Sequence, residues 1–407
     1  MINLILCYLL VSLYYNSYRY IFKISSSKTS PTYSDTPIWL SSGKYLIVFA
    51  IFGLMLLLYA VYKNKRRSFV DYNKQLGMES FSASIVFVFL FFYGAIVTIL
   101  IRDVYVFEAV CFFPIFVFMI ISNYNKEIFL DRAFRILKVS AWILLIVDLI
   151  QYALFYFFNR LPALAYEGSV SVRFGSIQDD PNGYAFLLTS LFFIGYTYSG
   201  LKKAIFYSLF LINMLLTISF TGMASAILAI SIVLLVSAPL SLTKLVLGWA
   251  SLILVFIGSI AVFQLPIVQN ILLTKQGSIE QHASLFGILT EVSFDDVLGL
   301  NPHGWVAESA YLNMMLNFGV IVTAITFVFI LVIVFNYAVK THSKNKSFSE
   351  LVKKPSYVFG LCAFSYTLAI LVGGINLPLE VVFPINALLP FFLGVLCLTA
   401  DVEAANS

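Results

Sequence analysis

The stretch AIFYSLFLINMLLTISFTGMASAILAISIVLLVSAPL, residues 204–240, contains no charged residue. A single helix of this length would be about 55 Å long, whereas the hydrocarbon core of a membrane is roughly 30 Å thick. Lys202 and Lys203 precede the stretch and Lys244 follows it, so both ends carry the same charge. The stretch therefore predicts two membrane helices joined by a reversal, which we expect at Thr221-Gly222.

The rest of the chain has the same character. Of its 407 residues 61% are hydrophobic and 11% are charged, and the mean hydropathy is +0.94. Soluble proteins average about 25% charged residues, so the composition indicates a polytopic membrane protein. The cysteines lie in or near apolar runs at spacings that suggest neither a disulfide framework nor a metal site. They are Cys7, Cys111, Cys362 and Cys397.

Apolar runs long enough to cross a membrane recur along the whole chain. They predict an all-α protein of about twelve transmembrane helices, forming a single integral membrane domain over residues 1–407. The runs cover 2–18, 44–62, 81–101, 104–122, 138–158, 183–199, 204–220, 222–240, 245–264, 309–338, 356–373 and 382–400.

The basic residues predict the orientation of these helices. Most of the 25 Lys and Arg residues lie in the gaps after even-numbered runs. By the positive-inside rule these gaps are cytoplasmic, and so are both termini. The long outer gaps 159–182 and 265–308 contain many of the acidic residues, so we expect them to form the active-site face.

The stretch VRFGSIQDDPNGYAFLL, residues 172–188, leads from the first long outer gap into a helix. Arg173 offers a planar fork of donors that suits phosphate. An Asp or Asn of the turn, Asp179, Asp180 or Asn182, can cap the helix that starts near Gly183, and the N-terminal end of that helix favours an anion. The alternative is an ordinary capped helix beside an interfacial arginine.

A second polar pattern lies in NPHGWVAESAYLNMMLNFGVI, residues 301–321. Polar residues at positions i, i+4 and i+8 place a stripe on an otherwise apolar helix, and this stripe should face protein or water. The stripe consists of Ser309, Asn313 and Asn317. Glu308 and His303 lie at its outer mouth, where either could act as a general base toward a sugar hydroxyl. The alternatives are interhelical hydrogen bonds and a surface histidine.

Single acidic residues in the apolar runs add further candidates. Asp148 falls near the middle of the fifth run, where an ionisable group is by default a functional hypothesis, although a bond to a neighbouring helix would also explain it. Glu108 lies near the outer end of the fourth run. Glu380, in the last outer gap, is expected to line the same mouth as Glu308.

The sequence lacks the motifs of nucleotide-driven and metal-dependent enzymes. It contains no HExxH, no Walker loop, no GxSxG and no DxD pair. His282, His303 and His342 are too scattered to form a metal cluster. We therefore expect no cofactor, no metal and no nucleic-acid partner. The energy for any reaction should come from an activated substrate at the outer face.

These two stretches resemble the O-antigen ligase and O-antigen (Wzy-type) polymerase superfamily. Residues 173–188 are similar to the family's Arg-x-x-Gly, Pro-Asn and helix pattern, with Arg173, Gly175 and the pair Pro181-Asn182 in those places, although the spacing from Arg173 to Gly175 is one residue shorter. Residues 308–321 are similar to its second motif, with Gly319 near the helix end. Glu308-Ser309 replaces the family's His-Asn pair, which argues against a ligase. Ser219-Phe220-Thr221 lacks the arginine that many relatives carry there.

The resemblance implies a metal-independent glycosyltransferase of the GT-C type in the bacterial inner membrane. It would join oligosaccharide repeat units, carried on undecaprenyl pyrophosphate, at the periplasmic face. Arg173 would bind the diphosphate, and Glu308 would act as base with His303 nearby. The lipid bilayer surrounds the enzyme, and a chain-length regulator is a candidate partner. The substrate-binding residues would be Arg160, Lys275, Asn182, Tyr311 and Asn313.

Other readings remain open at this point. A ligase would transfer the finished glycan to lipid A core, and a flippase would move lipid-linked oligosaccharide across the membrane. A small-solute transporter would depend on Asp148 and Glu108. The clustering of polar residues in two outer gaps favours an enzyme over a flippase, which should carry charges and repeats through its bundle.

Overall fold

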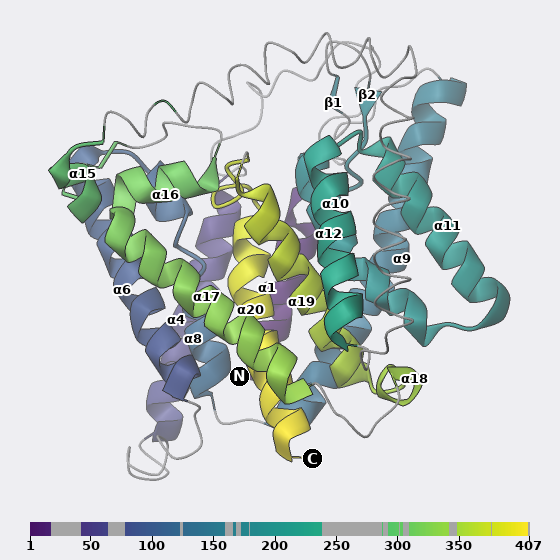
Figure 1. Ribbon diagram of the computed structural model, residues 1–407, viewed down its shortest axis with the longest axis horizontal. Coiled ribbons are helices and arrows are strands. Elements are labelled where there is room, and N and C mark those ends of the chain that lie inside the picture. Colours follow the sequence, from purple (N-terminus) through teal and green to yellow (C-terminus); the bar gives the residue numbers. More distant parts are fainter. Residues whose placement is uncertain are drawn as a thin grey trace.

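A computed structural model gives the fold of the chain (Figure 1). Its described residues are 1–17, 42–63, 78–122, 125–158, 166–167, 172–178, 180–237, 287, 292–300, 302–303, 309–341, 348–375 and 377–405. The expected span 245–264 and most of the two long outer gaps lie outside these residues.

Helices make up almost all of the regular structure in the described part of the chain. Their bounds are α1 (Ile2–Tyr14), α4 (Gly43–Lys63), α6 (Met78–Ile101), α7 (Tyr105–Glu108), α8 (Pro114–Ile121), α9 (Lys126–Phe158), α10 (Pro181–Leu191), α11 (Gly200–Leu216), α12 (Phe220–Ser237), α15 (Phe294–Leu298), α16 (Ala310–Phe318), α17 (Val320–Thr341), α18 (Phe348–Leu351), α19 (Pro355–Gly373) and α20 (Ile385–Ala405). Two 3₁₀ helices, η1 (Tyr15–Ser17) and η3 (Phe192–Thr197), and a two-residue antiparallel ladder of β1 (Tyr166–Glu167) with β2 (Val172–Arg173) complete the fold.

Six helices among the described residues are long and apolar enough to cross a membrane. The spans are Gly43–Val61, Glu79–Ile101, Phe220–Ser237, Val320–Thr341, Pro355–Gly373 and Ile385–Glu403. The protein is therefore an all-α membrane protein, as the composition predicts.

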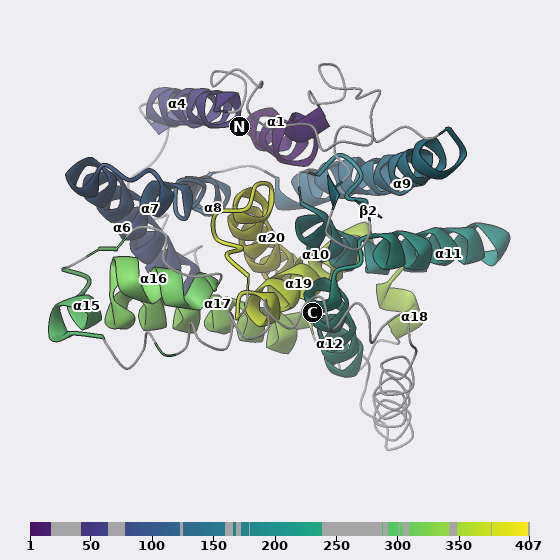
Figure 2. The ribbon, with the colours of Figure 1, turned by 90° about the horizontal axis from the view of Figure 1, so that it is seen from above.

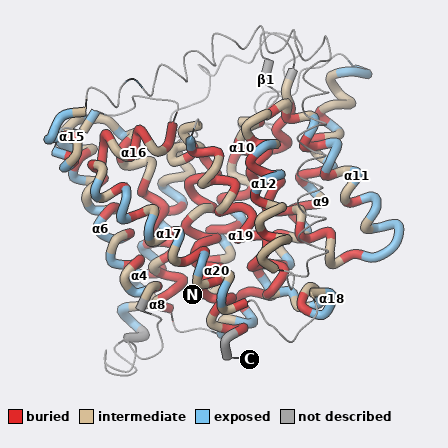
Figure 3. The backbone as a smooth tube through the Cα atoms, viewed as in Figure 1, coloured by how far each residue is buried: buried red, intermediate tan, exposed pale blue. Residues whose placement is uncertain are grey.

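Helices α19 and α20 form the centre of the bundle. In these two helices 78% and 89% of the spanning window is buried, against at most 33% in the other four. Figures 1 and 2 show the remaining long helices around this pair, and Figure 3 shows burial concentrated along it. Large apolar side chains such as Leu57, Phe92 and Phe335 are exposed on the peripheral helices, where lipid would cover them.

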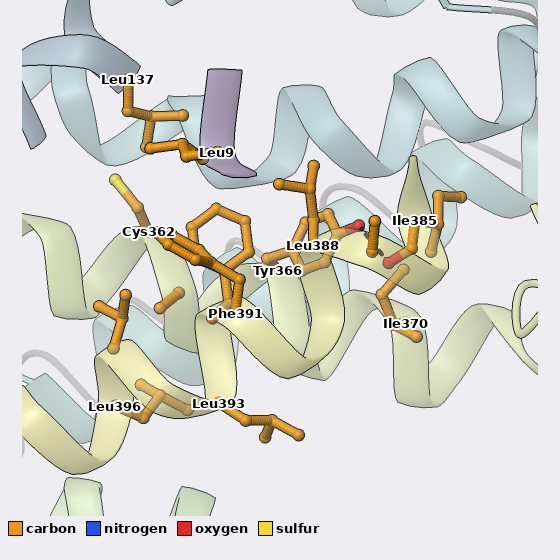
Figure 4. Packing of buried hydrophobic residues seen from close by; sticks show 14 of the residues in the cluster. Leu9, Leu137, Cys362, Tyr366, Ile370, Ile385, Leu388, Phe391, Leu393 and Leu396 are labelled. Atoms are coloured by element: carbon orange, nitrogen blue, oxygen red, sulfur yellow. Dashed lines mark hydrogen bonds between the residues drawn. The ribbon is translucent and has the colours of Figure 1, made fainter. Parts of the chain in front are cut away.

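Aromatic side chains fill the contact between the central pair and its neighbours. Phe391 of α20 packs against the rings of Tyr8, Phe129 and Phe359, which come from three other helices. Figure 4 shows Phe391 near Leu9, Cys362 and Tyr366, with the Tyr366 hydroxyl donating to the Ile385 carbonyl at 3.3 Å. The last two helices thus hold the first ones in place.

Both chain ends lie toward the same end of the bundle (Figure 1). Two ion pairs tie this end together: Lys126 to Asp401 at 2.7 Å, and Lys354 to Glu403 at 2.9 Å. The opposite end contains the β1–β2 ladder and the beginnings of α10 and α16. We call it the ladder end.

The reversal inside 204–240 is real, but its expected position is wrong. Helix α11 ends at Leu216 and α12 begins at Phe220, so the turn lies at 217–219 and not at Thr221-Gly222. Hydroxyl groups make this turn, because Thr217 Oγ1 accepts the Ser219 N–H and Ser219 Oγ accepts the Gly222 N–H. Ile218 between them has φ +48°. Serine and threonine can replace the lost helical partners of the backbone at such a point.

Gly222 instead allows close packing of α12 against α10. A Cβ atom at this position would clash with Ala185 Cβ and would lie 2.8 Å from Ser219 Oγ. We expect Gly222→Ala to destabilise the protein by about 1–3 kcal/mol through overpacking. Gly53→Ala is the matched control, because no atom lies within 4 Å of its added Cβ. Thermal unfolding in detergent measures both variants, and equal melting temperatures would contradict this account.

Three further helix boundaries differ from the expected runs. The run 309–338 divides at Gly319, where φ is +81° and a Cβ would lie 2.6 Å from the Gly299 nitrogen. As a result α16 lies across the end of α17 (Figure 1). The run 104–122 divides into α7 and α8. Helix α9 starts at Lys126, twelve residues before the apolar run, because the charged residues there continue the same helix.

Candidate functional site at the ladder end

Arg173 lies in β2, and its guanidinium joins segments that are far apart in sequence. Its Nε donates to the Thr217 carbonyl at 2.8 Å, and its Nη2 donates to Asn182 Oδ1 at 2.7 Å. Ser219 Oγ donates to the same Asn182 oxygen at 2.8 Å. Arg173, Asn182, Thr217 and Ser219 form what we call the Arg173 cluster. Arg173, expected to be catalytic, and Asn182, expected to bind substrate, are thus in direct contact.

The loop that follows Arg173 is anchored to α9. Ser176, at φ +54°, donates its N–H to Asp148 Oδ1 at 3.0 Å, and its carbonyl accepts from Gln151 Nε2 at 2.6 Å. Its hydroxyl donates to the Leu144 carbonyl at 2.7 Å. Asp148 is fully buried. Asp148 therefore anchors the loop that follows Arg173, so its buried carboxylate has a structural role.

The N-terminus of α10 lies beside the guanidinium. Asp180 caps this helix, because its carboxylate accepts from the N–H groups of Asn182 at 3.0 Å and Gly183 at 3.3 Å. Burial raises the pKa of Asp180, while these N–H donors and the Arg173 charge act in the opposite direction. The expected capping role is confirmed for Asp180. Asp179 lies outside the described residues.

A second group of polar residues surrounds Glu380. The Tyr105 hydroxyl donates to Glu380 Oε1, and Asn313 Nδ2 donates to this oxygen at 3.0 Å and to the Tyr105 oxygen at 2.6 Å. We call Tyr105, Asn313 and Glu380 the Glu380 cluster. Burial raises the pKa of Glu380 to about 7, although the hydrogen bonds from Tyr105 and Asn313 act to lower this pKa. The pKa of Tyr105 is also raised, first by burial and then by the Glu380 charge.

A small cavity adjoins the Glu380 cluster. It offers about 50 Å³ of space for solvent, and its walls are mainly apolar side chains of α16, α17 and α19. Glu380 and Asn386 both line it. Glu380 Oε2 and Asn386 Oδ1 are buried, and neither has a hydrogen-bond partner among the described residues. Two oxygens that lack donors at one cavity can accept hydrogen bonds from a small bound group.

The loop between α19 and α20 connects the two clusters. A Cβ on Gly183, in the first turn of α10, would lie 3.4 Å from Ile385 Cδ1 and 3.5 Å from Val382 Cγ1. Glu380 is two residues before Val382. The loop that contains Glu380 therefore also contacts the first turn of α10, which contributes Asn182 to the Arg173 cluster.

The other predicted site residues have varied surroundings. His303 is exposed and its Nε2 lies 2.7 Å from Asp296 Oδ1, away from the contacts of both clusters. Hydrogen bonds from Ser293 and His303 hold the pKa of Asp296 well below its usual range. The Tyr311 hydroxyl donates to the Leu371 carbonyl and its ring packs on Phe327, which ties α16 to its neighbours. Glu308, Arg160 and Lys275 lie outside the described residues.

Sequence reasoning missed two participants at this end. Tyr105 lies inside the run 104–122, which was expected to be one continuous span, so its place beside Glu380 depends on the division of that run into α7 and α8. Asn386 stands in the first turn of α20 and donates to the Glu108 carbonyl at 3.1 Å. Glu108 itself accepts from the Tyr45 hydroxyl at 2.8 Å, which gives this carboxylate a structural partner. Only the polar residue types inside apolar runs could have drawn attention to them.

The fold and these contacts define an all-α membrane protein with a polar site at one end of its bundle. Comparison with protein-family models finds none that matches the chain, and comparison with curated proteins finds no match either. Among the described residues no three His, Cys, Asp or Glu side chains lie together as a metal site would require.

Proposed function

We propose that the protein polymerises oligosaccharide repeat units carried on undecaprenyl pyrophosphate into O-antigen or a related surface polysaccharide. It would be a metal-independent glycosyltransferase of the GT-C type, with about twelve spans in the bacterial inner membrane. Both termini would be cytoplasmic, so the ladder end would face the periplasm. The basic residues near the termini support this orientation under the positive-inside rule.

The observation that carries the proposal is the placement of Arg173. Its side chain is fixed by Asn182 and by the α11–α12 turn, beside the N-terminus of an eleven-residue helix. A positioned guanidinium favours a phosphate group, whereas the N–H groups of Asn182 and Gly183 at the helix N-terminus already bind the Asp180 carboxylate. Three separate segments that meet at one arginine form a preorganised arrangement, and preorganisation is what stabilises charge in a transition state.

In the proposed reaction, a hydroxyl oxygen of the acceptor sugar forms a bond to the anomeric carbon of the donor glycan. The bond between that carbon and the diphosphate oxygen breaks, and the electron pair leaves with undecaprenyl pyrophosphate. Arg173 would stabilise the negative charge that develops on this leaving group. The proton of the hydroxyl passes to a base.

Two carboxylates are candidates for the base. Glu308 is the candidate from the sequence pattern. Within the described residues Glu380 is the stronger one, because a pKa of about 7 suits proton transfer near neutral pH. Its Oε2 is also without a donor in the described part of the chain. Asn313 and Tyr105 would hold the carboxylate in place from the other oxygen.

Deleting the gene and separating the surface glycan on a gel tests the function. Loss of a polymerase should leave core that bears a single repeat unit. Bare core with polymer retained on the lipid carrier would indicate a ligase, and single lipid-linked units on the cytoplasmic side would indicate a flippase. A normal ladder of long chains in the deletion strain would refute all three functions.

A further inference from the structure

Three lysines lie over aromatic rings where η3 meets α11, far from the site described above. Lys138 Nζ is 4.7 Å and Lys202 Nζ is 4.8 Å from the centre of the same Tyr198 ring. Lys203 Nζ is 4.9 Å from the Tyr196 ring. We call these three lysines, with Tyr196, Tyr198 and Trp142, the lysine–aromatic cluster.

The rings of this cluster are held in place. Trp142 Nε1 donates to the Tyr198 hydroxyl at 2.7 Å, and the Tyr198 ring packs on Phe206 with centroids 5.4 Å apart. Tyr196 contacts Phe348 of α18 at 5.5 Å between centroids. Since α18 leads into Lys354, which pairs with Glu403, the cluster lies toward the end of the bundle that has both termini. The lysines therefore sit on a fixed aromatic platform.

No acidic side chain neutralises these three lysines in the part of the chain that the structure describes. The ion pairs found there involve Lys126, Lys354, Arg135 and His303. Two ammonium groups on one ring repel each other, and cation–π attraction offsets this by only about 0.5–2 kcal/mol. An anion placed between the ammonium groups would remove the repulsion.

The surroundings are those of a membrane interface. Tryptophan and tyrosine gather where hydrocarbon meets water. The apolar side chains of Val139, Leu201 and Ile205 are exposed next to the lysines, at 61%, 76% and 44%. A ligand for this site thus needs an anionic group at the lysines and hydrocarbon beside it.

We propose that the lysine–aromatic cluster binds the headgroup of an anionic phospholipid. The phosphodiester would lie between the Lys138 and Lys202 ammonium groups, with Lys203 at the rim and the acyl chains against Val139, Leu201 and Ile205. Anionic lipids attract basic residues at the membrane surface, and basic pockets between helices bind their headgroups. This site is independent of the proposed polymerase activity.

Native mass spectrometry of the full-length protein, titrated with phosphatidylglycerol or phosphatidylcholine, tests the proposal. Each lysine near the surface contributes about fivefold in affinity, so Lys138→Gln with Lys202→Gln should weaken phosphatidylglycerol binding about 25-fold. Phosphatidylcholine binding should not change. Lys138→Arg with Lys202→Arg keeps the charges and should stay within about threefold of the wild type.

The matched control removes two lysines elsewhere at the same end, Lys340→Gln with Lys353→Gln, and should leave phosphatidylglycerol binding intact. An equal loss in this control would overturn the proposal, since the binding would then reflect total surface charge. Displacement of the lipid by millimolar inorganic phosphate would also overturn it, because the site would then take free phosphate. Phosphatidylglycerol should raise the melting temperature of the wild type and not of the Lys138/Lys202 glutamine variant, which separates lost binding from lost folding.

Discussion

Replacing Arg173 with lysine should reduce polymer formation at least tenfold, although the positive charge remains. A lysine offers a single ammonium on a flexible stem and cannot reproduce the two fixed bonds to the Thr217 carbonyl and Asn182 Oδ1. A tenfold lower rate corresponds to about 1.4 kcal/mol of lost transition-state stabilisation. Arg173→Ala should lower the rate further. The length of the glycan ladder, compared at equal protein abundance in the membrane, measures the effect.

Arg135→Lys is the control for this experiment. Arg135 is an exposed residue of α9 at the opposite end and pairs with Asp131 at 2.7 Å across one helical turn. Exposed pairs of this kind contribute little, so the ladder should not change. If the Arg173→Lys protein is present at normal abundance and gives wild-type glycan chain lengths, Arg173 does not act in the reaction.

Replacing Glu380 with glutamine should remove a pH dependence of stability. The pKa of Glu380 in the folded protein is about 7, above its ordinary value of 4.5, so the folded state binds this proton more tightly. The contribution of Glu380 to stability is therefore greatest below pH 4.5, falls as the pH rises through 7, and is lower by roughly 3 kcal/mol at higher pH. Tyr105 keeps its proton throughout, because its own pKa is raised. Glu380→Gln should match the wild type near pH 4.5 and melt at a higher temperature at pH 8.

The same variant tests the catalytic proposal separately. If Glu380 accepts the proton, polymer formation by the wild type should rise through pH 7, and Glu380→Gln should be low and independent of pH. Glu350→Gln, on the exposed side of α18, should leave both profiles unchanged. A glutamine variant with a wild-type ladder would exclude Glu380 as the base, whereas identical melting profiles would contradict its raised pKa.

The sequence predicts the class of fold well, because hydrocarbon demands long apolar helices and the composition supplies them. The reversal in 204–240 follows from length alone. Its position does not, since Thr217 and Ser219 turn the chain with their hydroxyl groups while Gly222 serves packing. Apolar periodicity carries no information about such local bonds. The division of 309–338 at Gly319 was also missed, because no charged residue interrupts the run at that point.

The candidate site was predictable in part. Arg173, Asn182 and Asp180 lie within ten residues, so local pattern suffices to group them. The contact of Tyr105 with Glu380 spans 275 positions and depends on how α7 packs against the loop between α19 and α20. For Asp148 the sequence was misleading. Its expected position near the middle of a membrane span suggested a functional role, but in the structure its carboxylate accepts a hydrogen bond from the Ser176 N–H and anchors a loop. A residue type indicates that a polar partner exists, but only the fold determines which one.

The hydrogen bonds of Arg173 form in a definite order during synthesis of the chain, because the Thr217 carbonyl is made after the arginine. The arginine is synthesised before two members of its cluster, since Thr217 and Ser219 follow it by more than forty residues, and the loop with Glu380 follows by about two hundred. Domains form as the chain emerges from the ribosome, at about 5–20 residues per second. The arginine must therefore wait several seconds for the α11–α12 hairpin and longer for the last loop. A chain that terminates before residue 217 carries the arginine without the Thr217 carbonyl that holds its guanidinium.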